Sequence, residues 1–257
     1  MKTSTIALLI TVGLITVSGT DAPAQMSAAE PVSIAVYGAS GRVGSRIVRE
    51  ALDRGHSVTG IGRTPANITE RHERLMAVQG DVTDTASVIE LVAGHDVVIS
   101  AVGGVNPDSD DPMLSITRQA TVSLVDALRA LGDDAPRMMV IGGARVTLDR
   151  EPGVPYFDLE NGSLGTEIEG ARVTVNMIGH ALALDYLRTL TDIEWTFVAP
   201  PLDLLAGERT GVFRVGPGVV MRDTEGRNSI SMEDLAVAII DEIEMPRYIG
   251  SRMTAAY

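Results

Sequence analysis

The sequence predicts an α/β fold in which a doubly wound, parallel sheet is covered by helices on both faces. Two observations carry this prediction. Short, almost continuously apolar segments alternate with amphipathic helical segments, which is typical of a parallel sheet buried on both sides. The first apolar segment also ends in a glycine-rich turn that leads directly into a helical pattern. The length of 257 residues suits one domain with an extended core.

Each expected element follows from a local pattern. Strands are expected at 32–37, 57–62, 75–79, 96–102, 137–141 and 194–199. Helices are expected at 41–54, 85–93, 112–131, 167–190 and 232–243. Asp111 before Pro112, and Ser231 followed by Asp234, are typical helix starts. Residues 32–256 are expected to form one domain with a small C-terminal portion, from 143 onward, on the substrate side.

Three glycines stand between the first expected strand and the first helix, at a G-x-x-G-x-x-G spacing. Gly38 suits the tight turn, Gly41 the approach of phosphates to the main chain, and Gly44 close packing of the helix on the sheet. A strand, a glycine turn and a helix N-terminus together are typical of pyrophosphate binding in Rossmann-like folds. We therefore predict a dinucleotide site here, with a purely structural turn as the alternative.

Ligands of such folds bind beyond the carboxyl ends of the strands, so the residues after each strand are informative. Arg63 stands where an acidic residue would bind the ribose 2′-hydroxyl of NAD; with Arg42 in the glycine loop, it favours the 2′-phosphate of NADP. Two ordinary surface arginines are the alternative. Asp81 can accept a hydrogen bond from the adenine amino group or cap the next helix near Thr85. Gly103-Gly104 can let the backbone pass beside the cofactor, or form a plain loop.

Composition excludes several classes of function. The net charge of −13 argues against nucleic-acid binding, which needs a basic surface. The chain has no cysteine, so disulfides, thiolate nucleophiles and cysteine metal sites are excluded. Its only lysine is Lys2, which leaves no lysine for catalysis in the folded domain. The four histidines are scattered along the chain, and we expect no metal site.

Residues 1–24 read as a secretory signal peptide. Lys2 is followed by an apolar run over 6–17 that is too short to span a bilayer, and Ala22-Pro23-Ala24 is a suitable cleavage site. We expect an exported, periplasmic protein with no membrane insertion after processing. The alternative is a cytoplasmic protein that starts at Met26. Export would separate the chain from nicotinamide cofactors, which are cytoplasmic molecules.

Several short segments form a pattern along most of the chain. They are Gly-Ala-Ser-Gly-Arg-Val-Gly at 38–44, Arg-Gly-His-Ser-Val-Thr at 54–59, Gly-Arg-Thr-Pro at 62–65, Gly-Asp-Val-Thr-Asp at 80–84, and further stretches at 94–101, 140–144, 194–201 and 207–211. Together they resemble the atypical short-chain dehydrogenase/reductases, in particular the NAD(P)H-binding group that includes NmrA-like proteins and assigned NADH-flavin reductases. The resemblance covers about residues 32–256 and is specific for fold and cofactor class.

The resemblance implies that NADP(H) is preferred to NAD(H). It implies cofactor-binding residues in the glycine loop and in the turns after the next strands. These are Gly38, Ser40, Gly41, Arg42, Val43, Arg63, Asp81 and Val82, with Gly44 completing the loop. It also implies a nicotinamide placed near Val102, Gly103, Gly142 and Gly143.

The chain departs from ordinary members of this family at the catalytic positions. Gly142-Gly143-Ala144 stands where those members carry a serine, and residues 175–182 lack Tyr-x-x-x-Lys. Without an acid–base group for a hydroxyl proton, alcohol and ketone chemistry is disfavoured. A flavin or quinone can take its proton from water, so positioning supplies most of the catalysis. We therefore expect an NAD(P)H-dependent oxidoreductase that reduces a flavin- or quinone-like small molecule.

Two other outcomes stay open. One is a non-catalytic redox sensor that binds the cofactor and changes a partner contact, and the other is a fold that has lost the cofactor. Two side chains are candidates for a catalytic role. His180 could donate a proton near the nicotinamide or pack against the sheet, and Tyr156 could cover the acceptor or pack on the surface. Arg209 is expected to pin the C-terminal strands, with a substrate contact as the alternative.

Overall fold

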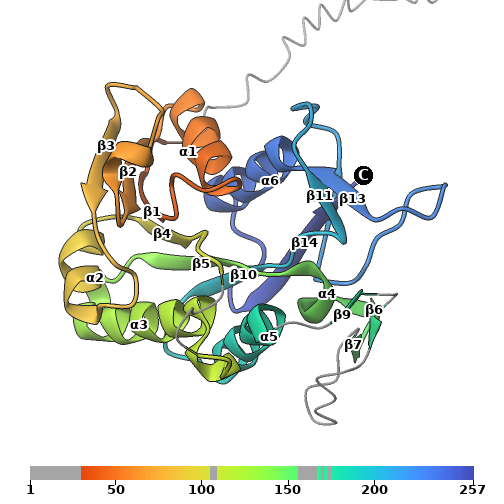
Figure 1. Ribbon diagram of the computed structural model, residues 1–257. Coiled ribbons are helices and arrows are strands. Elements are labelled where there is room, and N and C mark those ends of the chain that lie inside the picture. Colours follow the sequence, from red (N-terminus) through yellow and green to blue (C-terminus); the bar gives the residue numbers. More distant parts are fainter. Residues whose placement is uncertain (1–29, 105–108, 156–166, 169–170, 173–174) are drawn as a thin grey trace, which may run out of the picture.

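Figure 1 shows the protein as a computed structural model, which describes residues 30–104, 109–155, 167–168, 171–172 and 175–257. The strands of the main sheet are β1 (Ser33–Tyr37), β2 (Ser57–Gly62), β3 (Leu75–Gln79), β4 (Val97–Ser100), β5 (Arg137–Ile141), β10 (Trp195–Val198), β12 (Arg214–Gly216) and β14 (Ser251–Ala256). The helices are α1 (Gly44–Asp53), α2 (Thr85–Val92), α3 (Ile116–Leu131), α4 (Ala144–Thr147), α5 (Val175–Arg188) and α6 (Met232–Glu244). Short strands pair as β6 (Asp149–Glu151) with β7 (Val154–Pro155), β8 (Glu167–Ile168) with β9 (Ala171–Arg172), and β11 (Asp203–Leu205) with β13 (Ser229–Ser231).

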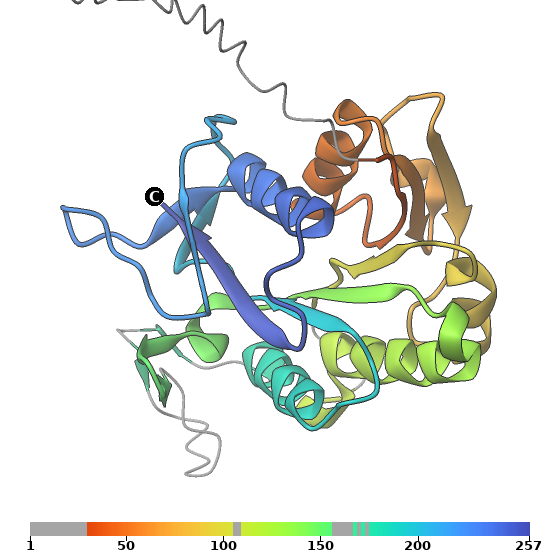
Figure 2. The same cartoon turned by 180° about the vertical axis from the view of Figure 1, so that it is seen from behind.

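The main sheet has the strand order β12-β14-β10-β5-β4-β1-β2-β3, and all neighbours are parallel except β12 and β14. Helices α1 and α6 cover one face, and α2, α3 and α5 cover the other, as the opposite views in Figure 1 and Figure 2 show. Successive side chains of β1 alternate between the two cores. Ile34 and Val36 join the core under α1 and α6, whereas Ala35 and Tyr37 join the other core. The predicted doubly wound sheet is confirmed.

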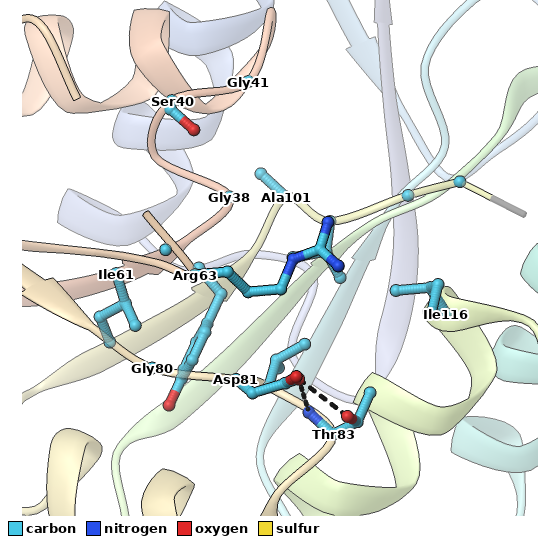
Figure 3. A pocket seen from close by; sticks show the side chains of 16 residues that line it. Gly38, Ser40, Gly41, Ile61, Arg63, Gly80, Asp81, Thr83, Ala101 and Ile116 are labelled. Carbon is cyan, nitrogen blue, oxygen red and sulfur yellow. Dashed lines mark hydrogen bonds between the residues drawn. The ribbon is translucent and has the colours of Figure 1, made fainter. Parts of the chain in front are cut away.

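The strand order reverses at β1. Strands β2 and β3 follow β1 on one side of it in the sheet, and β4 pairs with the other edge of β1. Ligands of open parallel sheets bind at such a switch point, beyond the carboxyl ends of the strands. Gly38, Gly80 and Ala101 follow β1, β3 and β4, and they border one common space (Figure 3). The topology thus places the glycine loop next to the ends of three other strands.

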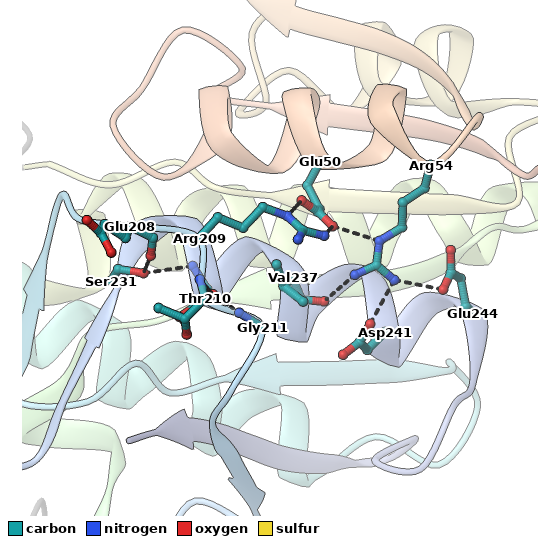
Figure 4. A network of polar contacts seen from close by, with 11 residues as sticks. Glu50, Arg54, Glu208, Arg209, Thr210, Gly211, Ser231, Val237, Asp241 and Glu244 are labelled. Carbon is teal, nitrogen blue, oxygen red and sulfur yellow. Dashed lines mark hydrogen bonds and ion pairs between the residues drawn. The ribbon is translucent and has the colours of Figure 1, made fainter.

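Helix α1 is fixed by charged side chains as well as by its buried apolar stripe. The Glu50 carboxylate is almost fully buried and accepts hydrogen bonds from Arg54 Nε at 2.7 Å and from Arg209 Nε and Nη2 at 2.7 and 2.8 Å. Arg54 also donates to Asp241 and Glu244 of α6 at 2.7 and 2.8 Å (Figure 4). Arg209 therefore has a structural role, as expected, but it ties the 207–211 loop to α1 and not to the C-terminal strands.

The N-terminus of α6 binds the C-terminal end of the chain. Ser231 Oγ accepts from the Asp234 amide at 2.9 Å, so the predicted cap is present. The Asp234 carboxylate accepts from the amides of Thr210 and Gly211 at 2.8 Å and from the Tyr257 hydroxyl at 2.9 Å. The Ser231 amide donates to that same Tyr257 hydroxyl at 3.1 Å. The acidic residue of this cap therefore anchors the 210–211 turn and Tyr257.

Two expected helices differ from the structure. The helix expected at 167–190 is wrong in its first part: α5 begins at Val175, and the short antiparallel strands β8 and β9 precede it. Residues 167–174, before α5, contain one glycine and three β-branched residues, which disfavour a helix. The helix expected at 112–131 is divided into a 3₁₀ turn at Pro112–Leu114 and α3. Ser115 has an extended backbone between them and caps α3 through the Arg118 amide at 3.3 Å.

Two features of the described residues bear on function. None of the described helices has the length and apolar character needed to cross a membrane. Within the same residues, no group of three or more histidine, aspartate or glutamate side chains is placed to hold a metal ion.

We expect Glu50→Gln to lower the free energy of unfolding by about 2–3 kcal/mol, because two guanidinium groups lose a buried, charged partner. Glu90→Gln, which changes an exposed carboxylate on α2, is the matched control and should shift the free energy of unfolding by no more than about 0.5 kcal/mol. Urea unfolding at pH 7 measures both. Equal stabilities of wild type and Glu50→Gln would contradict the role given to this carboxylate.

The same pair of proteins gives a pH dependence. Burial alone would raise the pKa of Glu50, but hydrogen bonds from Arg209 and Arg54 outweigh it and hold the pKa below its ordinary value of 4.5. When a carboxylate has a lower pKa in the folded than in the unfolded protein, its charge stabilises the fold at pH values above the unfolded-state pKa. This stabilisation is lost as the pH falls through the folded-state pKa. The stability gap between wild type and Glu50→Gln should therefore be constant from pH 8 to about 5 and shrink below about 4.5.

Candidate functional site

A pocket of about 720 Å³ opens at the carboxyl edge of β1, β2, β3 and β4, a size within the range of roughly 300–1,000 Å³ typical of small-molecule sites. Most of the predicted cofactor-binding residues line it. These are Gly38, Ser40, Gly41, Arg63, Asp81, Val82, Val102 and Gly103. Other predicted residues lie outside its lining. These are Arg42, Val43, Gly44, Gly142 and Gly143.

The glycine loop is a turn that side chains would obstruct. Gly38 has φ +78°, and a Cβ built there would lie 2.7 Å from the carbonyl oxygen of Ala101. A Cβ on Gly44 would lie 2.1 Å from the carbonyl oxygen of Gly38. That same carbonyl accepts from the Gly41 amide at 2.8 Å and closes the turn. The loop therefore brings bare main chain to the pocket and packs α1 directly against it.

The N-terminus of α1 suits an anion. Its N-cap, Val43, makes no side-chain cap, and the first turn holds no acidic residue. In contrast, Asp84, Ser115 and Ser231 cap α2, α3 and α6 with their side chains. The amides of Ser45 and Arg46 donate to the carbonyls of Gly41 and Val43 at 2.9 and 3.0 Å, but no capping side chain stands between a ligand and the positive end of the helix dipole. Together with the bare glycine loop, this end fits a pyrophosphate group.

Arg63 and Asp81 border the pocket after β2 and β3 (Figure 3). The Arg63 side chain is exposed and forms no ion pair with the residues that the structure describes. Asp81 accepts from the Thr83 amide at 2.9 Å and from its hydroxyl at 2.8 Å. These bonds, chiefly that from the Thr83 amide, and the charge of Arg63 hold the pKa of Asp81 below its ordinary value. Asp84, and not Asp81, caps α2, so the capping alternative for Asp81 is wrong.

The Gly103-Gly104 main chain, which lines the pocket, contacts α5 on its other side. The Gly104 amide, which follows β4, donates to Asn176 Oδ1 at 3.2 Å. His180, one turn further along α5, lies next to the main chain after β4 and after β5. A Cβ on Gly103 would lie 4.0 Å from His180 Nε2, and one on Gly143 would lie 3.0 Å from His180 Cδ2. Gly142 faces away, since a Cβ there would lie 2.2 Å from the Phe197 ring.

His180 is a neutral imidazole at this site. Burial lowers its pKa to about 4, and its buried Nδ1 atom has no hydrogen-bond partner in the described part of the chain. A proton donor that works near pH 7 needs a pKa close to that value, so His180 is poorly suited to give up a proton. Tyr156, the other catalytic candidate, lies outside the described residues.

Sequence reasoning missed some residues at the pocket. Tyr37, Thr83, Ala101 and Ile116 also line it. Tyr37 and Ala101 stand at the carboxyl ends of β1 and β4, so their strand positions were a usable signal. Ile116 begins α3, and Asn176 contacts the Gly104 loop from α5. No local pattern marks these two, because their positions depend on helices that pack across the end of the sheet.

Comparisons with known proteins agree on the fold and the cofactor class. A family described as NAD(P)H-binding matches residues 38–246. A Burkholderia pseudomallei structure, provisionally named an exported protein, is 36% identical (TM-score 0.69) over 88% of this chain and 100% of that one. A Bacteroides thetaiotaomicron structure, provisionally named an epimerase, is 31% identical (TM-score 0.73) over 89% of this chain and 98% of that one. A Streptococcus pneumoniae structure, provisionally named an NADH-flavin reductase, is 28% identical (TM-score 0.69) over 88% of this chain and 99% of that one.

Gly44→Ala tests the packing of α1 on the loop. Helix propensity alone would favour alanine by about 1 kcal/mol. The contact with the Gly38 carbonyl should reverse that sign and cost about 1–3 kcal/mol of unfolding free energy, because backbone must move. Gly62→Ala is the control, since a Cβ there meets nothing within 4 Å. A Gly44→Ala protein as stable as wild type in urea would refute the contact.

Proposed function

The chain belongs to the NAD(P)H-binding family, and on this premise we propose that it is an NADP(H)-dependent oxidoreductase with a flavin- or quinone-like acceptor. The observation that carries the preference for NADP(H) is Arg63. The residues after β2 are Arg63 and Thr64, so no carboxylate follows that strand to bind a ribose 2′-hydroxyl. A forked, always-charged donor that borders the pocket without an ion-pair partner in the described structure suits a phosphate.

The proposal gives each part of the pocket a role toward the cofactor. The loop from Gly38 to Gly44 and the uncapped end of α1 would hold the pyrophosphate. Arg63, with Arg42 from the glycine loop, would bind the 2′-phosphate, and Asp81 and Val82 would contact the adenine. The nicotinamide would lie at the end bordered by Val102 and Gly103, with Gly142 and Gly143 nearby.

The proposed reaction asks little acid–base chemistry of the protein. Bound NADPH supplies a hydride, which together with one proton from water converts a quinone to a hydroquinone and leaves NADP⁺. The chain itself would orient a flat acceptor on main chain that carries no side chains at Gly103, Gly104 and Gly143. Orientation of two bound reactants can supply much of the rate enhancement. The absence of Tyr-x-x-x-Lys disfavours an alcohol dehydrogenase or an epimerase.

The second candidate is a redox sensor that binds NADP(H) without turnover. The observation in its favour is that, among the described residues, few ionisable side chains lie at the proposed nicotinamide end, where His180 is held neutral. The sensor and the enzyme share the cofactor site and differ only in whether an acceptor is reduced.

We also propose that the protein is exported, with residues 1–24 as its signal peptide. The sequence pattern of that segment supports this, and so does the provisional name of the Burkholderia relative. Translation from Met26 is the competing account. N-terminal sequencing of the protein from its native host decides between them: a start at Gln25 supports export, and a start at Met26 contradicts it.

Arg63→Ala should weaken NADPH binding about 10- to 100-fold, because a charged hydrogen bond contributes about 1.5–3 kcal/mol. NADH, which lacks the 2′-phosphate, should bind within about twofold of wild type. Titration of cofactor fluorescence measures both dissociation constants. Arg49→Ala, which removes an exposed arginine paired with Glu70, is the control. Unchanged NADPH affinity in Arg63→Ala would show that the 2′-phosphate assignment is wrong.

Purified wild-type protein should oxidise NADPH in the presence of FMN, riboflavin or simple quinones, at rates above those without protein. Absorbance at 340 nm follows the reaction. Saturable NADPH binding with no oxidation in any of these assays would favour the sensor. Absence of both binding and oxidation would refute the proposal.

A further inference from the structure

Asn176 and His180 stand four residues apart on α5, and side chains at this spacing lie on one face of a helix. Each meets main chain that follows a strand at the end of the pocket. Asn176 Oδ1 accepts from the Gly104 amide at 3.2 Å, and the His180 ring packs beside Gly103 and Gly143. One face of α5 therefore holds the glycine pair after β4 in place and presents an imidazole next to it.

Gly179, which precedes His180, determines how closely α5 packs against α3. A Cβ on Gly179 would lie 1.9 Å from Ser115 Oγ and 2.4 Å from Ser115 Cβ. Ser115 is fully buried and caps α3. Helix α5 can approach α3 this closely only because residue 179 has no side chain, and the approach sets where His180 lies.

The two ring nitrogens of His180 have different surroundings. Among the residues that the structure describes, buried Nδ1 has no hydrogen-bond partner, and an unpartnered buried N–H is rarer than an unused lone pair. This favours the tautomer with the proton on Nε2. Nε2 is the ring nitrogen near Gly103, which lines the pocket and places no side chain in front of it. Burial is the only cause of the lowered pKa of His180, so no charged group of the described residues accounts for it.

From this arrangement we propose that neutral His180 donates a hydrogen bond from Nε2–H to a carbonyl oxygen of the electron acceptor, and that Asn176 positions the Gly103-Gly104 main chain beside it. The inference rests on the proposed function and narrows its substrate class. The acceptor is a planar ring system that carries a carbonyl oxygen, such as a quinone. His180 polarises that oxygen and keeps its own proton, and the proton that completes the reduction comes from water.

The test compares two substitutions and two acceptors. His180→Gln keeps an N–H donor near the position of Nε2, and His180→Met removes it at similar volume. Menadione carries carbonyl oxygens, whereas methylene blue is a planar acceptor without one. With NADPH saturating, kcat/KM for menadione should fall about tenfold in His180→Met and by no more than about threefold in His180→Gln. The value for methylene blue should stay within about twofold of wild type in both.

A second readout does not need turnover. In ¹⁵N-histidine NMR spectra, the signals lost in His180→Gln identify His180, and they should show a neutral ring with the proton on Nε2 from pH 5.5 to 8. His95→Gln is the control, because His95 bonds Thr59 Oγ1 at 2.9 Å just before β4 begins, at the other end of that strand from the pocket. It should leave kcat/KM for both acceptors unchanged.

Several outcomes would overturn the inference. A protonated His180 near neutral pH, or a proton on Nδ1, contradicts the donor geometry. Equal losses with menadione and methylene blue indicate a purely structural role. A menadione rate that falls about tenfold per pH unit from 5.5 to 7.5 indicates a proton donor instead. If wild-type protein neither binds NADPH nor reduces either acceptor, the proposed function fails and the inference with it; normal NADPH binding and menadione turnover in His180→Met refute the inference alone.

Discussion

The close contact between Gly44 and the carbonyl of Gly38 is the constraint on which the site depends. It joins the first residue of α1 to the turn after β1, and it leaves no room for a side chain. Hydrogen bonds from the Gly41 amide to the Gly38 carbonyl and from the Ser45 amide to the Gly41 carbonyl tie the start of α1 to this turn, so its uncapped N-terminus faces the switch point of the sheet. The charged residues on α1 then hold its far half against α6 through Glu50 and Arg54.

Main chain at two places around the pocket is therefore held by helices that approach their neighbours closely at a glycine. At one end, α1 meets the glycine loop through Gly44. At the other, α5 meets α3 through Gly179 and Ser115, and Asn176 holds the Gly104 loop. A closely packed frame of this kind suits chemistry in which orientation of two flat reactants matters more than proton transfer. The polar groups that bear on recognition, Arg63 and His180, lie at separate places on this frame.

Much of the fold could be predicted because parallel strands carry strong local signals. The first and last residues of β2, β3 and β5 agree with the prediction, because glycine, aspartate or arginine residues flank these apolar segments. Strand β14 was missed because its sequence, Ser-Arg-Met-Thr-Ala-Ala, is only weakly apolar, and it is buried through pairing with β10. In the site, Gly38 and Arg63 could be predicted because each directly follows a strand. Asn176 was not, because its contact with Gly104 joins elements 72 residues apart.

The most direct test of the central claim, that this pocket binds NADP(H), is a crystal structure of the protein with NADP⁺. The account predicts the pyrophosphate against the main chain of residues 38–44 at the N-terminus of α1, and the 2′-phosphate within about 3.5 Å of the Arg63 guanidinium. A structure at saturating NADP⁺ with the pocket empty, or with the dinucleotide bound elsewhere on the protein, would contradict it.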